Sequence, residues 1–412
     1  MRAPGRRWPA SFGLAVATAL AVVAAGLGCS EDLVAPGNCP GLCPSSGVRM
    51  ADTTLAGIVT QDSTYVGYVA VSEADFVVLS DTDSQRAIAL VRFGARDSTW
   101  TPSGSDTAVG IGRVDSVTAR VYVLRRDTSV HDVRVLLYRM PVGFDSGMGY
   151  VAAQQYLADS LLVDSLPVPD SVASGAVTVR LRAGVLDTIP ATDSGVVALA
   201  LAVRASQRTS VSIASSDNDT VTGFRLDWYV HARAPADTLA KTLSASPSYD
   251  GFASEAGSLP AGALRAGGMP ASRSILRLSL PDWATDSVGL VRATLILTPI
   301  RPVGGRPLEE FRLSARGVVR DFGAKSLVYS DTSAGGTVPL TAGDSGEVHI
   351  DVVRLLREWG SAAGDSLPRA LMLLVEPEAS GMGEVVFAPA SAGAAAPRLR
   401  VTHVIPYVFG VP

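Results

Sequence analysis

Two aspartate-rich turns contain the residues best suited to bind a metal ion. Asp81 and Asp83 lie in the first turn, and Asp217 and Asp219 lie in the second. Calcium takes carboxylate and carbonyl oxygens of this kind from surface loops. Aspartates also occupy ordinary hairpin turns, where they accept hydrogen bonds from their own backbone. The sequence therefore favours a chain without a cofactor and leaves calcium as the alternative.

Tryptophan rings are the second group with a chemistry of their own, because sugar-binding proteins stack aromatic rings on sugar faces. Trp100 stands in a polar loop, and Trp283 follows a Pro-Asp turn. Both are candidate ligand-binding residues, although the Trp100 ring could also fold back onto the sheet. Trp228 and Trp359 lie within apolar patterns and are predicted to be core residues.

Catalytic machinery is not predicted. Gly343-Asp-Ser-Gly346 resembles the nucleophile turn of trypsin-like proteases, but no histidine has a matching context and a triad needs its base. Glycosidic chemistry needs two carboxylates at a set separation, and many turn aspartates could supply them. A non-enzymatic protein is the prediction, with a polysaccharide hydrolase or lyase as a remaining alternative.

The N-terminus has the pattern of an export signal over residues 1–28. Three arginines precede an apolar run from about residue 12 to residue 27. The sequence Ala25-Gly-Leu-Gly-Cys29 resembles a bacterial lipobox, which predicts a lipid on Cys29. Plain secretion and a retained transmembrane helix are the alternatives. Ser30 after the cysteine points to an exported lipoprotein of the outer membrane or cell surface.

Residues 29–53 are rich in Pro, Gly and Ser and are predicted to be a flexible tether. Cys39 and Cys43 lie in this tether. An exported chain favours a local disulfide between them, whereas a metal site would need further ligands nearby.

Composition and charge favour an all-β protein without a nucleic-acid partner. Hydrophobic residues make up 47% of the chain and the net charge is −4. A negative chain lacks the basic surface that neutralises phosphates. Asp-Ser, Asp-Thr and Ser-Gly pairs recur between apolar runs, which is typical of strands joined by short turns.

An internal repeat predicts two tandem antiparallel β-sandwich domains of jelly-roll type, at 54–232 and 238–412. Arg86-Ala-Ile and Arg273-Ser-Ile open equivalent strands, and later strands keep nearly equal intervals in both halves. Alternating apolar residues predict sheets with one buried face. The second range is expected to fold alone. The first carries an extra loop around Trp100.

Two helical patterns interrupt the strands. Residues 150–161 carry apolar residues at helical spacing and predict a short crossover helix. Residues 351–359 carry a stripe that ends at Trp359 and predict a helix that covers one end of the second sandwich.

The second half resembles the DNRLRE-type domain, a bacterial extracellular β-sandwich grouped with carbohydrate-binding modules. The resemblance lies in Ser272-Arg-Ser-Ile-Leu, Ala293-Thr-Leu, Asp351-Val-Val ending at Trp359, and the last strand after Pro397. Residues 86–230 match the pattern more loosely. The resemblance implies a sandwich fold and a carbohydrate ligand, and it assigns no binding residue.

Together these features predict a non-catalytic lipoprotein that is anchored to a membrane and binds a polysaccharide or mediates adhesion. The alternative is a structural or assembly component of the cell envelope that binds protein partners through edge strands.

Overall fold

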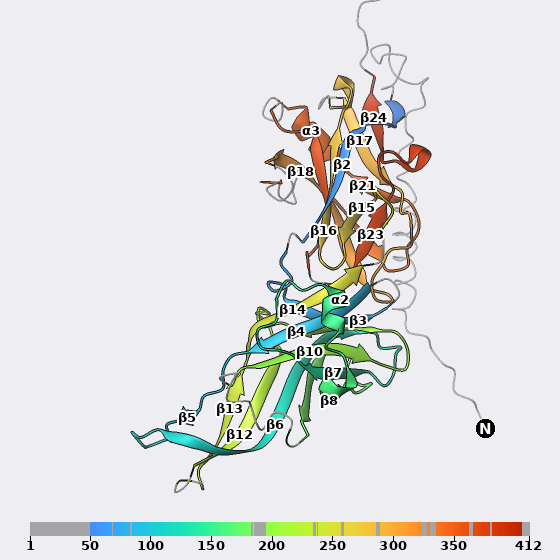
Figure 1. The fold of residues 1–412 in the computed structure, drawn as a ribbon. Helices are drawn as coiled ribbons and strands as arrows, with labels where there is room; N and C mark the ends of the chain where they lie inside the picture. The colour runs from blue at the N-terminus through green and yellow to red at the C-terminus, as the bar shows by residue number, and fades with distance from the viewer. Residues whose placement is uncertain are drawn as a thin grey trace, which may run out of the picture. The chain divides into compact units, whose positions relative to one another are not determined.

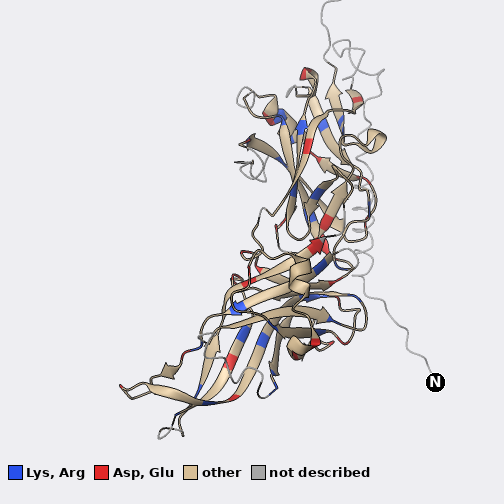
Figure 2. Ribbon diagram, viewed as in Figure 1, with Lys and Arg blue, Asp and Glu red and all other residues tan. Residues whose placement is uncertain are grey.

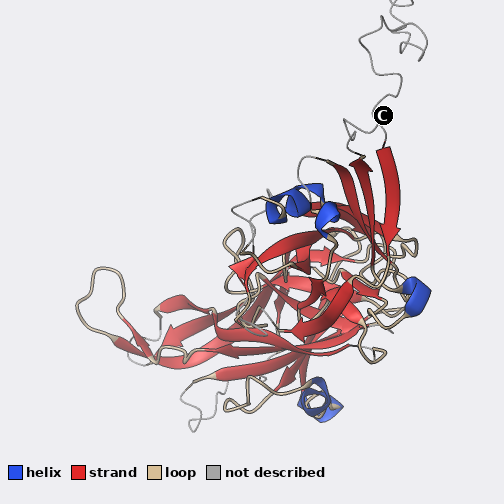
Figure 3. Ribbon diagram, turned by 90° about the horizontal axis from the view of Figure 1, so that it is seen from above, coloured by secondary structure: helices blue, strands red, loops and turns tan. Residues whose placement is uncertain are grey.

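The computed structural model describes residues 50–405, apart from residues 68, 83–84, 183, 185–194, 234–235, 237, 257–258, 286–288, 323–327, 330–334, 362–365 and 380. It is an all-β fold of curled antiparallel sheets with short helical turns (Figure 3), which confirms the predicted fold class. Residues 52–403 form one compact unit. The predicted signal peptide, the tether cysteines Cys29, Cys39 and Cys43, and Asp83 lie outside the described residues.

A first set of strands, here called the inserted sandwich, is continuous in sequence. Its strands are β3 (Phe76–Asp81), β4 (Gln85–Phe93), β5 (Thr99–Trp100), β6 (Val109–Arg126), β7 (Arg134–Arg139), β8 (Leu162–Pro167), β9 (Gly175–Arg180), β10 (Val197–Arg204), β11 (Ser210–Ala214), β12 (Arg225–Ala232), β13 (Ala240–Ala245) and β14 (Pro247–Ala256).

A second set, here called the split sandwich, comes from both sides of the first. Its strands are β1 (Met50–Leu55), β2 (Val59–Val66), β15 (Leu264–Gly267), β16 (Ser272–Leu278), β17 (Leu290–Leu297), β18 (Glu310–Arg320), β19 (Val328–Tyr329), β20 (Gly336–Thr341), β21 (Val348–Asp351), β22 (Ala370–Glu376), β23 (Glu384–Phe387) and β24 (Arg398–Val404).

Strand pairing supports the internal repeat. In the inserted sandwich β10 lies between β4 and β7, and β6 pairs with both β12 and β9. The split sandwich repeats this order, with β22 between β16 and β18, and β17 between β24 and β21. The pairs β3–β11 and β15–β23 also correspond. The two halves therefore share one topology.

The strands are not divided at the predicted boundary between residues 232 and 238. β13 and β14 follow that boundary, yet they pair with β12 and β4 of the inserted sandwich. β1 and β2 precede the inserted sandwich, yet they pair with β24 and β16 of the split sandwich. In Figure 1 the blue strand β2 accordingly runs among the yellow to red strands. The inserted sandwich thus interrupts the split sandwich in sequence.

Each sandwich has its own apolar core, built from the inward positions of alternating strands. Trp228 and Phe93 lie at the centre of the first core. In the second core, the predicted inward residues Leu276 and Leu295 are fully buried. Met269 and Met382, which are carried by loops of the split sandwich, pack into the core of the inserted sandwich. The compact unit is therefore held together partly by these two side chains.

The helical elements agree with the predictions in part. The crossover segment contains only one turn of helix, α2 (Tyr150–Gln154), and a 3-10 turn (Asp159–Leu161). The predicted second helix is α3 (Val353–Trp359), and its buried Trp359 belongs to the core of the split sandwich. Among the described residues, no helix combines the length and apolarity needed to cross a bilayer.

Candidate functional site

The exterior face of the sheet β2–β16–β22–β18–β20 carries the candidate site. Alternation sends Leu276 of β16 into the core, so Arg273, Ile275 and Arg277 point to the other side. The β16 register places Arg273 opposite Tyr65 of β2. This sheet therefore has one face buried in the core and an opposite, exterior face that is rich in arginine.

The floor of the site is apolar. It is a cluster of side chains on the central strands, formed by Ile275, Val318, Ala370, Met372 and Leu374. The rings of Tyr65 and Tyr329 pack against this cluster. The floor is therefore shielded from water by aromatic rings and by the arginines around them.

Tyr329 lies between two guanidinium groups. The Arg273 and Arg316 Cζ atoms lie 5.3 Å and 5.2 Å from the centre of its ring, within the range of cation–π attraction. Each arginine is also ion-paired, Arg273 with Glu378 and Arg316 with Glu376. The Tyr329 ring is thus held between two guanidinium groups, and each guanidinium group is itself held by an ion pair.

A groove of about 560 Å³ opens over this arrangement. Its lining is Arg312, Arg316, Tyr329, Leu374, Glu376, Pro377 and Glu378. Arg312 is exposed and has no ion-pair partner among the described residues. The groove therefore combines planar hydrogen-bonding groups, an aromatic ring and an apolar floor.

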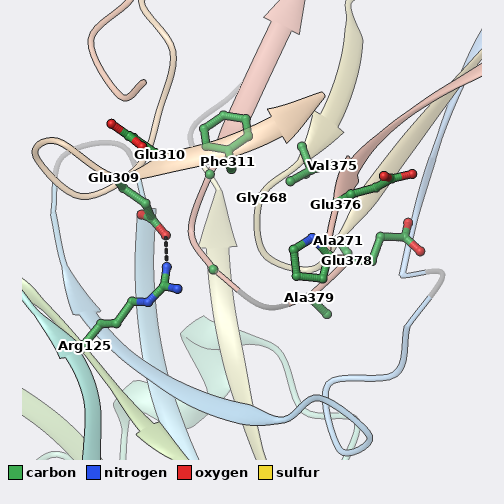
Figure 4. A pocket seen from close by; sticks show the side chains of 14 residues that line it. Arg125, Gly268, Ala271, Glu309, Glu310, Phe311, Val375, Glu376, Glu378 and Ala379 are labelled. Atoms are coloured by element: carbon green, nitrogen blue, oxygen red, sulfur yellow. Dashed lines mark ion pairs between the residues drawn. The ribbon is translucent and has the colours of Figure 1, made fainter. Parts of the chain in front are cut away.

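A smaller cavity of about 120 Å³ lies beside the groove and shares Glu376, Pro377 and Glu378 with it. Figure 4 shows Glu309 and Arg125 together on one side of this cavity, and Arg125 Nη1 lies 4.0 Å from Glu309 Oε1. Glu309 is buried, and its two carboxylate oxygens accept hydrogen bonds from the backbone N–H of Arg306 and of Met382. These hydrogen bonds hold Glu309 within the split sandwich, and its ion pair with Arg125 of β6 links that sandwich to the inserted one.

The equivalent face of the inserted sandwich is covered. Residues 141–162, which include α2, pack over β4, β10 and β7 and bury Phe144 and Tyr150. The Arg92 Cζ lies 5.1 Å from the Phe144 ring, and its Nη1 donates to the Val142 carbonyl. Figure 1 shows α2 above β14 and β4. The crossover segment thus buries the apolar side chains of this face.

Trp100 and Trp283 differ in exposure. Trp100 is only 7% exposed, because β5 pairs with the extended β6 and turns the ring into the core of the inserted sandwich. The prediction of an exposed sugar-stacking ring at Trp100 is therefore wrong. Trp283 is 37% exposed and lies against the His403 ring, with 4.6 Å between ring centres. It stays a candidate, distant in sequence from every residue of the groove lining.

The second aspartate-rich turn is held by its own hydrogen bonds. Asn218, between Asp217 and Asp219, accepts hydrogen bonds from the backbone N–H of Thr220 and Val221. Asp81, Asp217 and Asp219 join no cluster of three or more His, Cys, Asp or Glu side chains in the described part of the chain. The Gly343–Gly346 segment is an exposed turn, in which Asp344 accepts from the Thr341 N–H.

Sequence reasoning missed the groove residues Arg312, Arg316 and Tyr329, and also Arg273, which contacts the Tyr329 ring. A signal for three of them was present, since β16 and β18 carry arginine at outward positions of an alternating pattern. Tyr329 belongs to the short strand β19, which has no such pattern. Figure 2 shows basic and acidic residues mixed along the strands of both sandwiches, so charge alone does not single out this face.

The chain matches no known protein-family model, and no curated protein sequence is similar to it.

Proposed function

We propose that this protein is a non-catalytic, surface-anchored lipoprotein that binds polysaccharide, and that the groove of the split sandwich is the contact. Its lipid anchor would be Cys29, and its place the outer membrane or cell surface. The observation that carries the proposal is the Tyr329 ring held between Arg273 and Arg316 beside an open groove.

The chemistry of the groove suits a sugar. Guanidinium and carboxylate groups offer donors and acceptors in fixed planes, which match pairs of hydroxyl groups on a ring. Tyr329 offers apolar surface for the C–H face of the same ring, above the buried apolar floor. Because Glu376 and Glu378 are already paired with arginine, the groove is better suited to binding than to acid–base chemistry.

The protein-binding alternative receives less support from the edge of the same sheet. Edge strands bind a partner by adding a strand, which requires free backbone N–H groups. β20 pairs with β18 on one side and carries Pro339, which has no N–H to donate. This edge is therefore a poor template for a partner strand.

A glycan array followed by titration of the best ligand tests the proposal. Arg312→Ala removes an exposed guanidinium, so affinity should fall by about tenfold, or about 1.4 kcal/mol, without loss of stability. Tyr329→Ala should weaken binding by a similar factor because an aromatic contact contributes about 1 kcal/mol beyond its area.

Matched controls lie on the inserted sandwich. Arg180→Ala removes an exposed arginine of β9, and Tyr229→Ala removes a ring that is 44% exposed on β12. Both should bind normally. If these controls lose affinity as much as the groove variants, or if no glycan binds, the groove is not the site.

A further inference from the structure

Two pairs of consecutive strands, β1–β2 and β13–β14, occupy the same place in the two sandwiches. Each pair is called a hairpin here for its short connection, since its two strands hydrogen-bond to other strands and not to each other. β13 lies beside β12 and β14 beside β4, while β1 lies beside β24 and β2 beside β16. β12 corresponds to β24 and β4 to β16 in the repeat. Each hairpin therefore completes both sheets of one sandwich, and the split sandwich is incomplete without residues 50–66.

The hairpin β1–β2 is held mainly by polar and backbone contacts. β2 reads Val-Thr-Gln-Asp-Ser-Thr-Tyr-Val and none of its residues is fully buried. Ile58, in the turn, is its one buried apolar side chain, and Leu55, Val59 and Tyr65 are partly buried. Thr64 Oγ1 and Ser274 Oγ lie 2.8 Å apart across the strand pair.

The hairpin β13–β14 is held differently. It places Leu243 and Phe252 in the core of the inserted sandwich, and the Phe252 ring stacks on Phe76 with 6.4 Å between centres. Burying each such side chain removes a large apolar area from water, which stabilises the folded hairpin. Opening β1–β2 thus exposes much less apolar surface than opening β13–β14, and it should occur more often.

The connection between β2 and β3 determines whether the β1–β2 hairpin can leave the split sandwich of its own chain. Residues 67–75 run from the split to the inserted sandwich, and an extended segment of this length spans about 30 Å. Gly67 lies at its start with a φ of +73°. Ala74, near its end, is buried and accepts a hydrogen bond from Ser215 Oγ, so this end stays fixed to the inserted sandwich while the residues before it open to let β2 reach a second molecule.

We propose that a second copy of this chain can donate its β1–β2 hairpin to the split sandwich, in place of the resident hairpin. The donated segment has the same sequence, so every contact seen within one chain can form between two chains. The donor is then left with an open sandwich, which can accept a hairpin from the recipient or from a third copy. Closed dimers or linear multimers of the chain would result, and each copy would carry its own groove.

Mixing two full-length chains, each with one introduced cysteine, tests this exchange. Both carry Cys29→Ser, Cys39→Ser and Cys43→Ser, so the introduced thiols are the only ones. Thr64→Cys in one chain and Ser274→Cys in the other face each other only when a hairpin crosses between chains, because residues 64 and 274 are in register. Under mild oxidation the mixture should give a disulfide-linked dimer, mapped to residues 64 and 274 by mass spectrometry.

The other hairpin supplies a matched control. Ser254 and Ala87 are in register on β14 and β4, at the corresponding place. A mixture of Ser254→Cys and Ala87→Cys chains should give no such dimer. The doubly substituted Thr64→Cys/Ser274→Cys chain should form its disulfide within one chain when it is dilute, which verifies the geometry.

Two results would overturn the proposal. In one, the double variant forms its internal disulfide while the Thr64→Cys and Ser274→Cys mixture stays monomeric after prolonged incubation. In the other, the yield of the dimer linked through residues 64 and 274 is no higher than the yield of the dimer linked through residues 254 and 87 in the control mixture.

Discussion

The exterior faces of the two sandwiches are built from equivalent strands and have opposite properties. If Ile88 is aligned with Ile275 through the repeated Arg-x-Ile, the registers place Leu90 where Arg277 lies. Leu90 is buried beneath the crossover segment, whereas Arg277 is paired with Asp321 at 3.0 Å. The same sheet face is thus apolar and covered in one copy, and charged and open in the other.

The difference shows two ways to avoid a large exposed apolar surface on the exterior face of a sheet. A large exposed apolar patch favours association, so it is normally covered or made polar. The inserted sandwich uses residues 141–162 as a cover, and the split sandwich uses paired arginines and carboxylates around Tyr329. The groove that we propose as the binding site lies beside the second arrangement.

The largest expected effect concerns the folding of each sandwich alone. Residues 238–412 contain β13 and β14 without their partner strands, and they lack β1 and β2. Expressed alone, this fragment should not unfold cooperatively, contrary to the expectation from sequence. Residues 69–262 contain β3 to β14 and should unfold cooperatively, with lower stability because Met269 and Met382 are missing from their core.

Circular dichroism during thermal unfolding measures both fragments. A cooperative transition for residues 238–412 would mean that the split sandwich does not need its hairpin. It would also remove the asymmetry between a continuous and an interrupted sandwich.

A smaller effect is expected from the two tryptophans that were predicted to bind ligand. Trp100→Ala empties a buried site in the inserted sandwich, and its free energy of unfolding should fall by about 3 kcal/mol. Trp283→Ala removes a partly exposed ring and should cost less than about 1 kcal/mol. Urea denaturation of the two variants compares these costs. Equal losses would mean that Trp100 is not packed more tightly than Trp283.

Local patterns predicted much of this fold because they report burial. Alternation in β16 and β17 identified the inward residues Leu276 and Leu295, and the helical stripe identified α3 with Trp359. Trp228 was recognised as core from its apolar surroundings. Each of these properties depends on neighbours in sequence, so the sequence alone was sufficient.

Partner choice and loop placement were not predictable in the same way. The polar strand β2 gives a weak strand signal, and nothing in residues 50–66 specifies β16, more than 200 positions away, as the partner. Trp100 stands in a polar loop pattern, yet pairing of β5 with β6 buries it. Tyr329 becomes part of the groove only when Arg273 and Arg316 meet across β22.

The smallest expected effect concerns pH, and it differs in sign between the two hairpins. Arg400 Nε donates to Asp52 Oδ2 at 2.8 Å, and this bond lowers the pKa of Asp52 on β1 below its ordinary value of 3.8. Burial raises the pKa of Asp250 on β14, although Ser216 donates two hydrogen bonds to its carboxylate. One carboxylate therefore favours the charged form in the folded state, and the other favours the neutral form.

Acid should therefore loosen β1–β2 and tighten β13–β14. The Asp52 pair stabilises above pH 3.8, and this stability is lost as the pH falls through the lowered pKa. Protonated Asp250 is favoured by folding, so its stabilisation is gained as the pH falls through the raised pKa and is complete below 3.8.

Hydrogen-exchange protection, corrected for the intrinsic rate at each pH, should fall for β2 amides relative to β14 amides as the pH is lowered. Asp52→Asn should abolish the fall in β2 protection and leave β14 unchanged, and high salt should reduce it because the ion pair is exposed. A parallel loss of protection in both hairpins would show that acid acts on the whole fold and not on these two carboxylates.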